Sequence, residues 1–231
     1  MEWLELNINI RSDSVVEIDV ENWNRKNTYK WFKTFSNTTY SCNVVMDVTK
    51  LVNHAKMKNE SFFIDLLYIV LKGLNSIEEM RMRLVDEKPV IFDDINPAYT
   101  VMAESGTFEN VRYKNQNDFK TFYKISEENI QKAKVVSQVE EQEYNPENCY
   151  DEYYITCLPW INFTQFTHPI PDDVQSQCIP RICWGKYIES NGRFELTLNI
   201  TVSHLFVDGK PLADAFNGIQ DLLNNVDEIL Q

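Results

Sequence analysis

Glycine and proline are scarce in this sequence, and neither divides the chain. The 231 residues include only 6 glycines and 8 prolines, which form no linker, and no internal repeat is present. Apolar segments are instead spread along the whole chain, so we expect one domain rather than two.

Long apolar runs and a basic leader are also absent. No stretch approaches the ~18 consecutive apolar residues of a membrane span. The first five residues lack the basic and apolar regions of a signal peptide. We therefore expect a cytoplasmic protein that does not enter a membrane.

Positive charge is in short supply. The sequence has 22 lysines and arginines against 35 aspartates and glutamates, a formal net charge of -13. Binding to nucleic acid or to an anionic membrane needs clustered lysine and arginine, so neither partner is expected. The deficit still leaves room for a local basic spot that binds a phosphorylated cofactor.

Cysteine and histidine are too scattered to form a disulfide framework or a metal site. The five cysteines are odd in number and contain no Cys-x-x-Cys pair. We expect reduced thiols and no bound metal. The residues concerned are Cys42, Cys149, Cys157, Cys178 and Cys183, with His54, His168 and His204.

What the sequence does contain is enough apolar surface for a large core. Hydrophobic residues make up 43% of the chain and aromatic residues 13%, which is typical of a globular protein. Asp47 and Ser61 each precede a stretch with helical spacing and are candidate N-caps, and a third helix is expected from about Asp118. Strands alternate with these helices, which predicts an α/β fold with a mixed sheet. The expected strands lie near residues 40–46, 80–85, 90–93, 99–103, 153–158, 182–188 and 194–203.

An acidic segment interrupts this pattern. Residues 140–152 contain six acidic residues and few apolar ones. We interpret the segment as a solvated loop, with an acidic partner site as the alternative.

The most informative residues are near the C-terminus, where His204 is followed by Asp208 and Gly209. His204 comes at the end of a strictly alternating strand, and an amphipathic helix that opens with Pro211 comes after it. Imidazole in general titrates near neutrality, so a histidine on a rigid, partly dry element suits proton abstraction from a hydroxyl. The same short motif also fits a core histidine. The apolar positions of the strand are Phe194, Leu196, Leu198, Ile200 and Val202, and those of the helix are Leu212, Ala215, Phe216, Ile219, Leu222, Leu223 and Val226.

Five motifs in order carry a resemblance to a known family. From about residue 17 to the end, their sequence and spacing resemble the type A chloramphenicol acetyltransferases. Residues 1–16 are then an N-terminal extension of a single acyltransferase domain over 1–231. The motifs are Trp23-Asn24-Arg25-Lys26, Asn96-Pro97-Ala98-Tyr99-Thr100-Val101, Leu158-Pro159-Trp160-Ile161-Asn162-Phe163, Gly185-Lys186-Tyr187 and His204-x-x-x-Asp208-Gly209.

The resemblance implies a two-layer sandwich, with helices packed on a mixed sheet, that assembles as a homotrimer. Active sites lie between subunits, where acetyl-CoA enters from one side as co-substrate and an alcohol from the other. No cofactor is bound permanently. His204 is implied to come from one subunit and most of the acceptor pocket from its neighbour.

The resemblance also assigns roles to single residues. His204 is the implied general base, and Thr156 the hydroxyl that donates to the tetrahedral oxyanion. Asp208 is expected to form a buried pair with Arg25 inside one subunit, and breaking this pair should cost ~3–5 kcal/mol. Lys186 and Tyr187 match positions that line the CoA channel, although an ordinary strand edge fits them equally well.

The acceptor pocket shows matches and departures. Phe32, Tyr40, Thr100 and Phe108 match pocket positions of the family, which the neighbouring subunit would supply together with Thr156. His168 stands where leucine is usual, Thr38 replaces another pocket residue, Cys183 replaces a water-orienting threonine, and Ser203 replaces a histidine. For each aromatic residue alone, core packing is the alternative interpretation.

The sequence thus predicts an acetyl-CoA-dependent O-acetyltransferase, with chloramphenicol as the expected acceptor. One alternative is a related acyltransferase with another acceptor, such as a dihydrolipoyl acyltransferase core. Another is a non-catalytic binder of small molecules on the same fold. The presence of His204, Asp208, Arg25 and a hydroxyl at 156 favours an enzyme, because a binder needs no base.

Overall fold

We analysed the protein as a computed structural model, which describes residues 15–135 and 150–231. Most of the N-terminal extension, Cys149 and most of the acidic segment lie outside the described residues. The four other cysteines are free thiols. Among the helices of the described ranges, none is long and apolar enough to cross a membrane.

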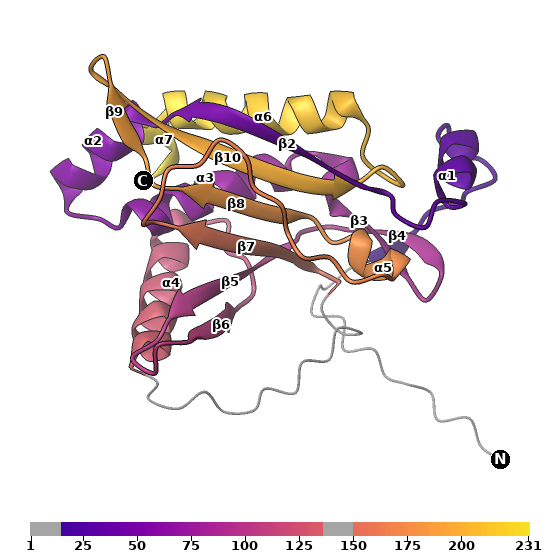
Figure 1. Cartoon of the computed structure of the whole chain (residues 1–231), viewed down its shortest axis with the longest axis horizontal. Coiled ribbons are helices and arrows are strands. Elements are labelled where there is room, and N and C mark those ends of the chain that lie inside the picture. Colours follow the sequence, from indigo (N-terminus) through magenta and orange to yellow (C-terminus); the bar gives the residue numbers. More distant parts are fainter. Residues whose placement is uncertain (1–14, 136–149) are drawn as a thin grey trace.

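A mixed sheet forms the centre of the molecule (Figure 1). Its strand order is β2-β10-β8-β7-β5-β6, with β9 paired to β10. The β5–β7 and β7–β8 pairs are parallel and the others antiparallel. The strands are β2 (Thr39–Asp47), β5 (Asn96–Met102), β6 (Phe108–Arg112), β7 (Glu152–Leu158), β8 (Arg181–Gly185), β9 (Ile188–Ser190) and β10 (Arg193–Ser203).

Helices cover one face of this sheet. In Figure 1, α3 and α6 lie behind the strands, and α4 lies beside β5 and β6. Gly73 of α3 permits close packing, since a Cβ there would come within 2.5 Å of Ile219 Cγ1 on α6. The helices are α1 (Lys26–Phe32), α2 (Thr49–Lys58), α3 (Phe62–Asn75), η1 (Glu78–Arg81), α4 (Phe119–Lys134), α5 (Val174–Gln177), α6 (Gly209–Asn224) and α7 (Val226–Ile229).

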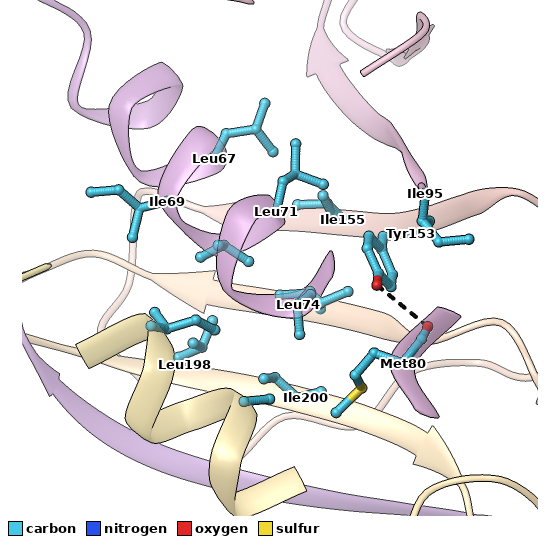
Figure 2. Packing of buried hydrophobic residues seen from close by; sticks show 14 of the residues in the cluster. Leu67, Ile69, Leu71, Leu74, Met80, Ile95, Tyr153, Ile155, Leu198 and Ile200 are labelled. Atoms are coloured by element: carbon cyan, nitrogen blue, oxygen red, sulfur yellow. Dashed lines mark hydrogen bonds between the residues drawn. The ribbon is translucent and has the colours of Figure 1, made fainter. Parts of the chain in front are cut away.

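The core lies between the helices and the sheet, and it follows the alternation seen in the sequence. Figure 2 shows leucines of α3 above Leu198 and Ile200 of β10, with Ile155 and Tyr153 of β7 alongside. The Tyr153 hydroxyl donates to the Met80 carbonyl oxygen at 3.3 Å, which satisfies a polar group inside the core. The apolar face of β10 therefore faces the helices. The leucines are Leu67, Leu71 and Leu74.

The opposite face of the sheet is covered by an irregular segment, residues 159–172. This segment crosses the strands in front of the sheet in Figure 1. It is held by a hydrogen bond from Phe166 N to Asn43 Oδ1 and one from Lys186 N to Ile161 O. Gly185 allows this approach, because a Cβ there would lie 2.8 Å from the Ile161 carbonyl oxygen.

Two features of the sheets differ from the expectation. The strands near residues 80–85 and 90–93 form a separate antiparallel sheet, in the order β1-β4-β3, and the pairing strands β1 and β6 were not predicted. Both are short, and β1 pairs only three residues with β4. Short strands give little periodicity, so only tertiary pairing defines them. The small sheet consists of β1 (Val15–Glu17), β3 (Met82–Val85) and β4 (Lys88–Phe92).

The helix boundaries also needed correction. Ser61 caps α3 as predicted, and Asp118, near which the next helix was expected to begin, is the N-cap of α4. Asp47, however, precedes the N-cap residue Val48, and its Oδ1 accepts from Thr49 N at 2.9 Å. The helix after His204, α6, begins at Gly209 rather than at Pro211.

Candidate active site

His204 lies directly after β10, in the turn that leads to α6. Its backbone N–H donates to the Thr38 carbonyl oxygen at 2.7 Å. Its ring stacks on Phe32 with a centroid distance of 4.1 Å and lies 4.8 Å from the Tyr40 ring. The side chain remains 36% exposed. The imidazole is thus held between aromatic rings while one side stays open.

Asp208 lies beside the imidazole. Its Oδ1 is 3.2 Å from His204 Nδ1, although the two groups are not aligned as a hydrogen bond and neither atom has another hydrogen-bond partner. A carboxylate at this place favours the tautomer with the proton on Nδ1. That tautomer leaves Nε2 with the lone pair that a base needs.

Arg25 holds the same turn from the other side. Its Nη1 contacts Asp208 Oδ2, and its Nη2 donates to the carbonyl oxygens of His204 and Leu205 at 3.5 and 3.4 Å. The expected pairing across 183 residues is therefore present. The Asp208 side chain is 41% exposed, so the pair is not the buried pair that we expected.

An aromatic cluster supports Arg25. The Trp23 ring lies 5.7 Å from the Arg25 guanidinium carbon and packs against Tyr29. Both rings also pack against Phe206, which belongs to the turn after His204. The tryptophan and arginine of the first motif thus act on the same turn, one by packing and one by charge.

The expected division of the site between subunits is wrong for two residues. Phe32 and Tyr40 were expected to reach His204 from the neighbouring subunit, yet both rings contact His204 of their own chain. The Tyr40 hydroxyl also donates to the Val207 carbonyl oxygen at 3.2 Å. Phe32 and Tyr40 belong to the half of the site that carries the histidine.

A second group of candidate residues lies in the middle of the sheet. Thr156 on β7 is in register with Cys183 on β8, which is in register with Asn199 on β10. Thr100 and Thr156 line one cavity of about 190 Å³ between β5 and β7. Its other lining residues are Ala98, Tyr99, Asn110, Arg112, Tyr154 and Ile155.

The two groups do not meet within one chain. His204 comes five residues after Asn199, whose register position connects it across β8 to Thr156. At ~3.4 Å per residue and ~4.8 Å per strand, the Cα atoms of His204 and Thr156 are roughly 20 Å apart. One chain therefore places the candidate base and the candidate hydroxyl donor at two separate places.

Two of the remaining acceptor candidates, Phe108 and Cys183, differ in how far they are exposed. Phe108 lies at the start of β6 with 57% of its surface exposed. Cys183 is 0% exposed, and burial raises the pKa of its thiol to about 12. Its thiol therefore reaches no open surface, and we do not keep it among residues that touch an acceptor.

His168 belongs to the covering segment rather than to a strand. Its ring lies edge-on to Phe166 at 4.8 Å. Burial, and secondarily the nearby Arg181, lower the pKa of His168 to about 4, while the Asn199 side chain opposes this shift. His168 is therefore neutral at pH 7, and its Nε2 is enclosed without a hydrogen-bond partner among the described residues.

The candidate CoA residues lie at the opposite end of β8 and β10 from His204. Lys186 is exposed between β8 and β9, and the Tyr187 ring packs 4.9 Å from Phe62 and 5.6 Å from Phe194. Lys56, which the sequence did not single out, places its Nζ 4.6 Å from the Phe194 ring. A cation and an aromatic cluster thus lie side by side in an otherwise acidic chain.

Two residues that hold His204 were missed or misplaced by sequence reasoning. Thr38 was expected to line the acceptor pocket, but it is buried and its carbonyl oxygen holds the histidine backbone. Gln177 was not considered, although it hydrogen-bonds both the backbone and the hydroxyl of Thr38. No local pattern marks a glutamine that acts across 139 residues.

Together, the fold and the arrangement of histidine, aspartate and arginine are those of an acyltransferase. The chloramphenicol acetyltransferase family model matches residues 14–220, so the chain belongs to that family. It is 29% identical to a chloramphenicol acetyltransferase of Clostridium perfringens, over 90% of this chain and 94% of the relative. A relative of the same name from Proteus mirabilis is 26% identical, over 89% and 93%.

Solved structures agree with this assignment. A chloramphenicol acetyltransferase structure superposes with a TM-score of 0.82 at 29% identity and covers 91% of this chain and 100% of its own. A dihydrolipoamide acetyltransferase of Azotobacter vinelandii has a TM-score of 0.61 at 17% identity, covering 89% and 88%. The second likeness shows a shared fold alone.

Proposed function

We propose that this acetyltransferase moves the acetyl group of acetyl-CoA to a hydroxyl of a small acceptor, with chloramphenicol as the expected acceptor. The observation that carries the proposal is the arrangement around His204. A half-exposed imidazole is fixed by two aromatic rings, an aspartate at Nδ1 and an arginine on the backbone. Such support is typical of a base that must keep one orientation.

The proposed reaction is a single direct transfer. His204 Nε2 removes the proton of the acceptor hydroxyl as its oxygen attacks the thioester carbonyl carbon. The tetrahedral oxyanion then collapses, the carbon–sulfur bond breaks, and the imidazolium returns the proton to the leaving thiolate. The products are the acetyl ester and free CoA thiol, and no covalent bond to the enzyme forms.

The hydroxyl that stabilises the oxyanion is assigned to Thr156 of a neighbouring subunit. The separation of roughly 20 Å within one chain supports this assignment, because an oxyanion donor must lie within ~3 Å of the reacting oxygen. A homotrimer, as in the resemblance described above, would bring the two halves together. Val45, Trp160 and Ile161 expose more than half of their surfaces on or beside the strand face that carries Thr156, as expected of residues that a second copy covers.

Acetyl-CoA is assigned to the side of Lys186 and Tyr187. The aromatic cluster of Tyr187, Phe62 and Phe194 offers a surface on which adenine can stack, and Lys186 and Lys56 offer charge for phosphate groups. This local basic spot matters because the chain as a whole carries a net charge of -13.

One observation favours a more polar acceptor than chloramphenicol. An enclosed Nε2 of His168 without a partner costs free energy unless a ligand bonds to it. If the covering segment, residues 159–172, shifts to expose this atom, an acceptor with a hydroxyl or amide directed at it would remove that cost. Such a compound, still acetylated on a hydroxyl, is the second candidate substrate.

The proposal is tested by following release of CoA thiol with acetyl-CoA, chloramphenicol and a panel of small alcohols. We expect turnover with at least one acceptor and a fall of at least ~100-fold in His204→Ala, the lower range for loss of a general base. CoA binding and the circular dichroism spectrum should not change. Near-normal turnover in His204→Ala would refute the role of the base, and binding of acceptors without any turnover would favour a non-catalytic binder.

A further inference from the structure

Ser203, His204 and Leu205 are connected by hydrogen bonds to one side chain on a distant helix, Gln177 of α5. The anchor runs through Thr38, the residue before β2. Thr38 and Gln177 are both buried, at 4% and 2% exposure. Because this network touches neither Arg25 nor Asp208 in any of its hydrogen bonds, it is a second and separate support for the turn.

The hydrogen bonds of this network can have only one direction. Gln177 Nε2 donates to the Ser36 carbonyl oxygen at 3.1 Å, so its Oε1 is the atom that faces Thr38. That oxygen accepts from Thr38 N at 3.0 Å and from Thr38 Oγ1 at 3.1 Å. An amide oxygen cannot donate, so the hydroxyl proton of Thr38 is committed to Gln177.

The hydrogen bond between Thr38 and Ser203 then has an assigned donor as well. Thr38 Oγ1 and Ser203 Oγ are 2.6 Å apart, and Thr38 has no proton left to give, so Ser203 donates to Thr38. Ser203 Oγ in turn accepts from Leu205 N at 3.2 Å. The chain of donors therefore runs from the Leu205 N–H through two hydroxyls to Gln177, and every proton in it has a partner.

His204 lies inside this chain. The Thr38 carbonyl oxygen accepts from His204 N. The Thr38 hydroxyl bonds to Ser203, the residue before His204, and Ser203 in turn accepts from the amide of Leu205, the residue after it. Helix α5, which carries Gln177, is itself held in place. Asp173 Oδ1 accepts from Ser176 N at 2.7 Å and caps the helix, and Arg181 Nη1 donates to the Ser176 carbonyl oxygen. The place of Gln177 is thus fixed by the sheet.

We propose that Gln177, acting through Thr38 and Ser203, is a positioning residue that fixes the backbone of His204 for proton abstraction. This inference rests on the proposed function of His204. It also gives a role to Ser203, which stands where the related enzymes have a histidine: a hydroxyl can both accept from Leu205 and donate to Thr38. The active geometry therefore depends on a helix outside the motifs.

The test compares Thr38→Val and Gln177→Met with a conservative variant, Thr38→Ser. Thr38→Val keeps the shape and the carbonyl oxygen but removes the hydroxyl, and Gln177→Met keeps the length but removes the amide. We expect each to lower kcat by about 5- to 50-fold while both KM values change less than about twofold, because misplaced groups lose rate rather than binding. Thr38→Ser should restore most of the rate.

Two controls make the result specific. Thr39→Val removes the hydroxyl of the adjacent threonine, which bonds only to Asn37 in the described structure, and should leave kcat unchanged. In a His204→Ala background, Thr38→Val should cause no further loss of the residual rate, and the double variant Thr38→Val/Gln177→Met should be no slower than Thr38→Val. An equal loss with and without His204 would overturn the proposal, as would wild-type kcat in both Thr38→Val and Gln177→Met.

A readout that needs no substrate separates this proposal from the proposed function. Hydrogen exchange of the His204 and Leu205 amides should become at least about tenfold faster in Thr38→Val and Gln177→Met than in Thr39→Val. Faster exchange without any acetyl transfer in the wild type would mean that the proposed function fails while the anchor stands. Unchanged exchange in an active enzyme would overturn the anchor alone.

Discussion

The histidine end of β10 and the centre of the sheet around Thr156 are built in opposite ways. His204 is held by a dense set of side-chain contacts, from Phe32, Tyr40, Asp208 and Arg25. Thr156 is placed by strand pairing, and its cavity opens between β5 and β7. A base must keep an orientation, whereas an oxyanion donor needs only a position that a strand already fixes. Under the proposed function, one chain thus carries two half-sites that are built by different means.

Mixing subunits would test this comparison most strongly. His204→Ala and Thr156→Ala alone should each lose at least ~100-fold in kcat. When the two variants are unfolded together and refolded as mixed trimers, about a quarter of the sites should recover, since each whole site then takes its base from one chain and its hydroxyl from another. The measurement is thiol release per active site in the mixture.

A matched mixture controls for refolding. His204→Ala refolded with His204→Gln should recover nothing, because no combination of these chains contains the base. Failure of the first mixture to recover, when wild type refolds well, would mean that both residues act within one chain or not together.

The buried carboxyl group of Asp65 should affect the stability of the protein without affecting either half-site. This residue of α3 is 0% exposed, and within the described part of the chain neither of its oxygens has a hydrogen-bond partner. Burial, with Glu60 nearby, raises the pKa of Asp65 to about 7, and His54 partly opposes the shift. Between about pH 4 and 7 the folded protein keeps a proton that the unfolded chain has lost, so this contribution to stability is complete below pH 4 and is lost as the pH rises through 7.

Asp65→Asn replaces the titrating carboxyl group with an amide that stays neutral at every pH tested. Between pH 5.5 and pH 8, the free energy of unfolding of wild type should fall relative to the variant by on the order of 2 kcal/mol. Urea unfolding at the two pH values measures the difference, and Asp221→Asn, an exposed carboxylate on α6, serves as control. A difference that grows in the opposite direction would mean that Asp65 is charged when folded. Turnover per folded enzyme at pH 7 should not change.

Arg25→Met tests how far the histidine half depends on charge. The variant loses the contact with Asp208 and the hydrogen bonds to two backbone carbonyl oxygens. We expect a loss of about 1.5–3 kcal/mol in unfolding free energy, below the range for a fully buried pair because Asp208 is half exposed. Lys30→Met, which breaks an exposed pair with Glu21, should cost less than about 0.5 kcal/mol. Equal losses in the two variants would show that Arg25 is an ordinary surface charge.

His168→Leu has the smallest expected effect and tests whether His168 contacts the acceptor. Removing an enclosed Nε2 that has no partner should raise kcat/KM for chloramphenicol by about 3- to 10-fold and lower it for an acceptor that bonds to the imidazole. Because the pKa of His168 is lowered to about 4, the effect should be constant from pH 6 to 8. If kcat/KM is the same for every acceptor in both proteins, His168 lies outside the pocket.

The sequence by itself determined the strands with clear alternation, the cap at Ser61, and the place of His204 at a strand end. These features depend on local spacing, which a single sequence displays. Arg25 and Asp208 could be paired only through the resemblance to a family. Tertiary structure alone decided that Phe32 and Tyr40 lie with the histidine, that Thr156 lies far from it, and that Gln177 holds Thr38. The physical reason is that the contacts of Phe32, Tyr40 and Gln177 join residues 139 or more positions apart by one or two directional bonds or a single ring contact, which leave no periodic trace along the chain. The distance of Thr156 from His204 follows from strand pairing across the sheet.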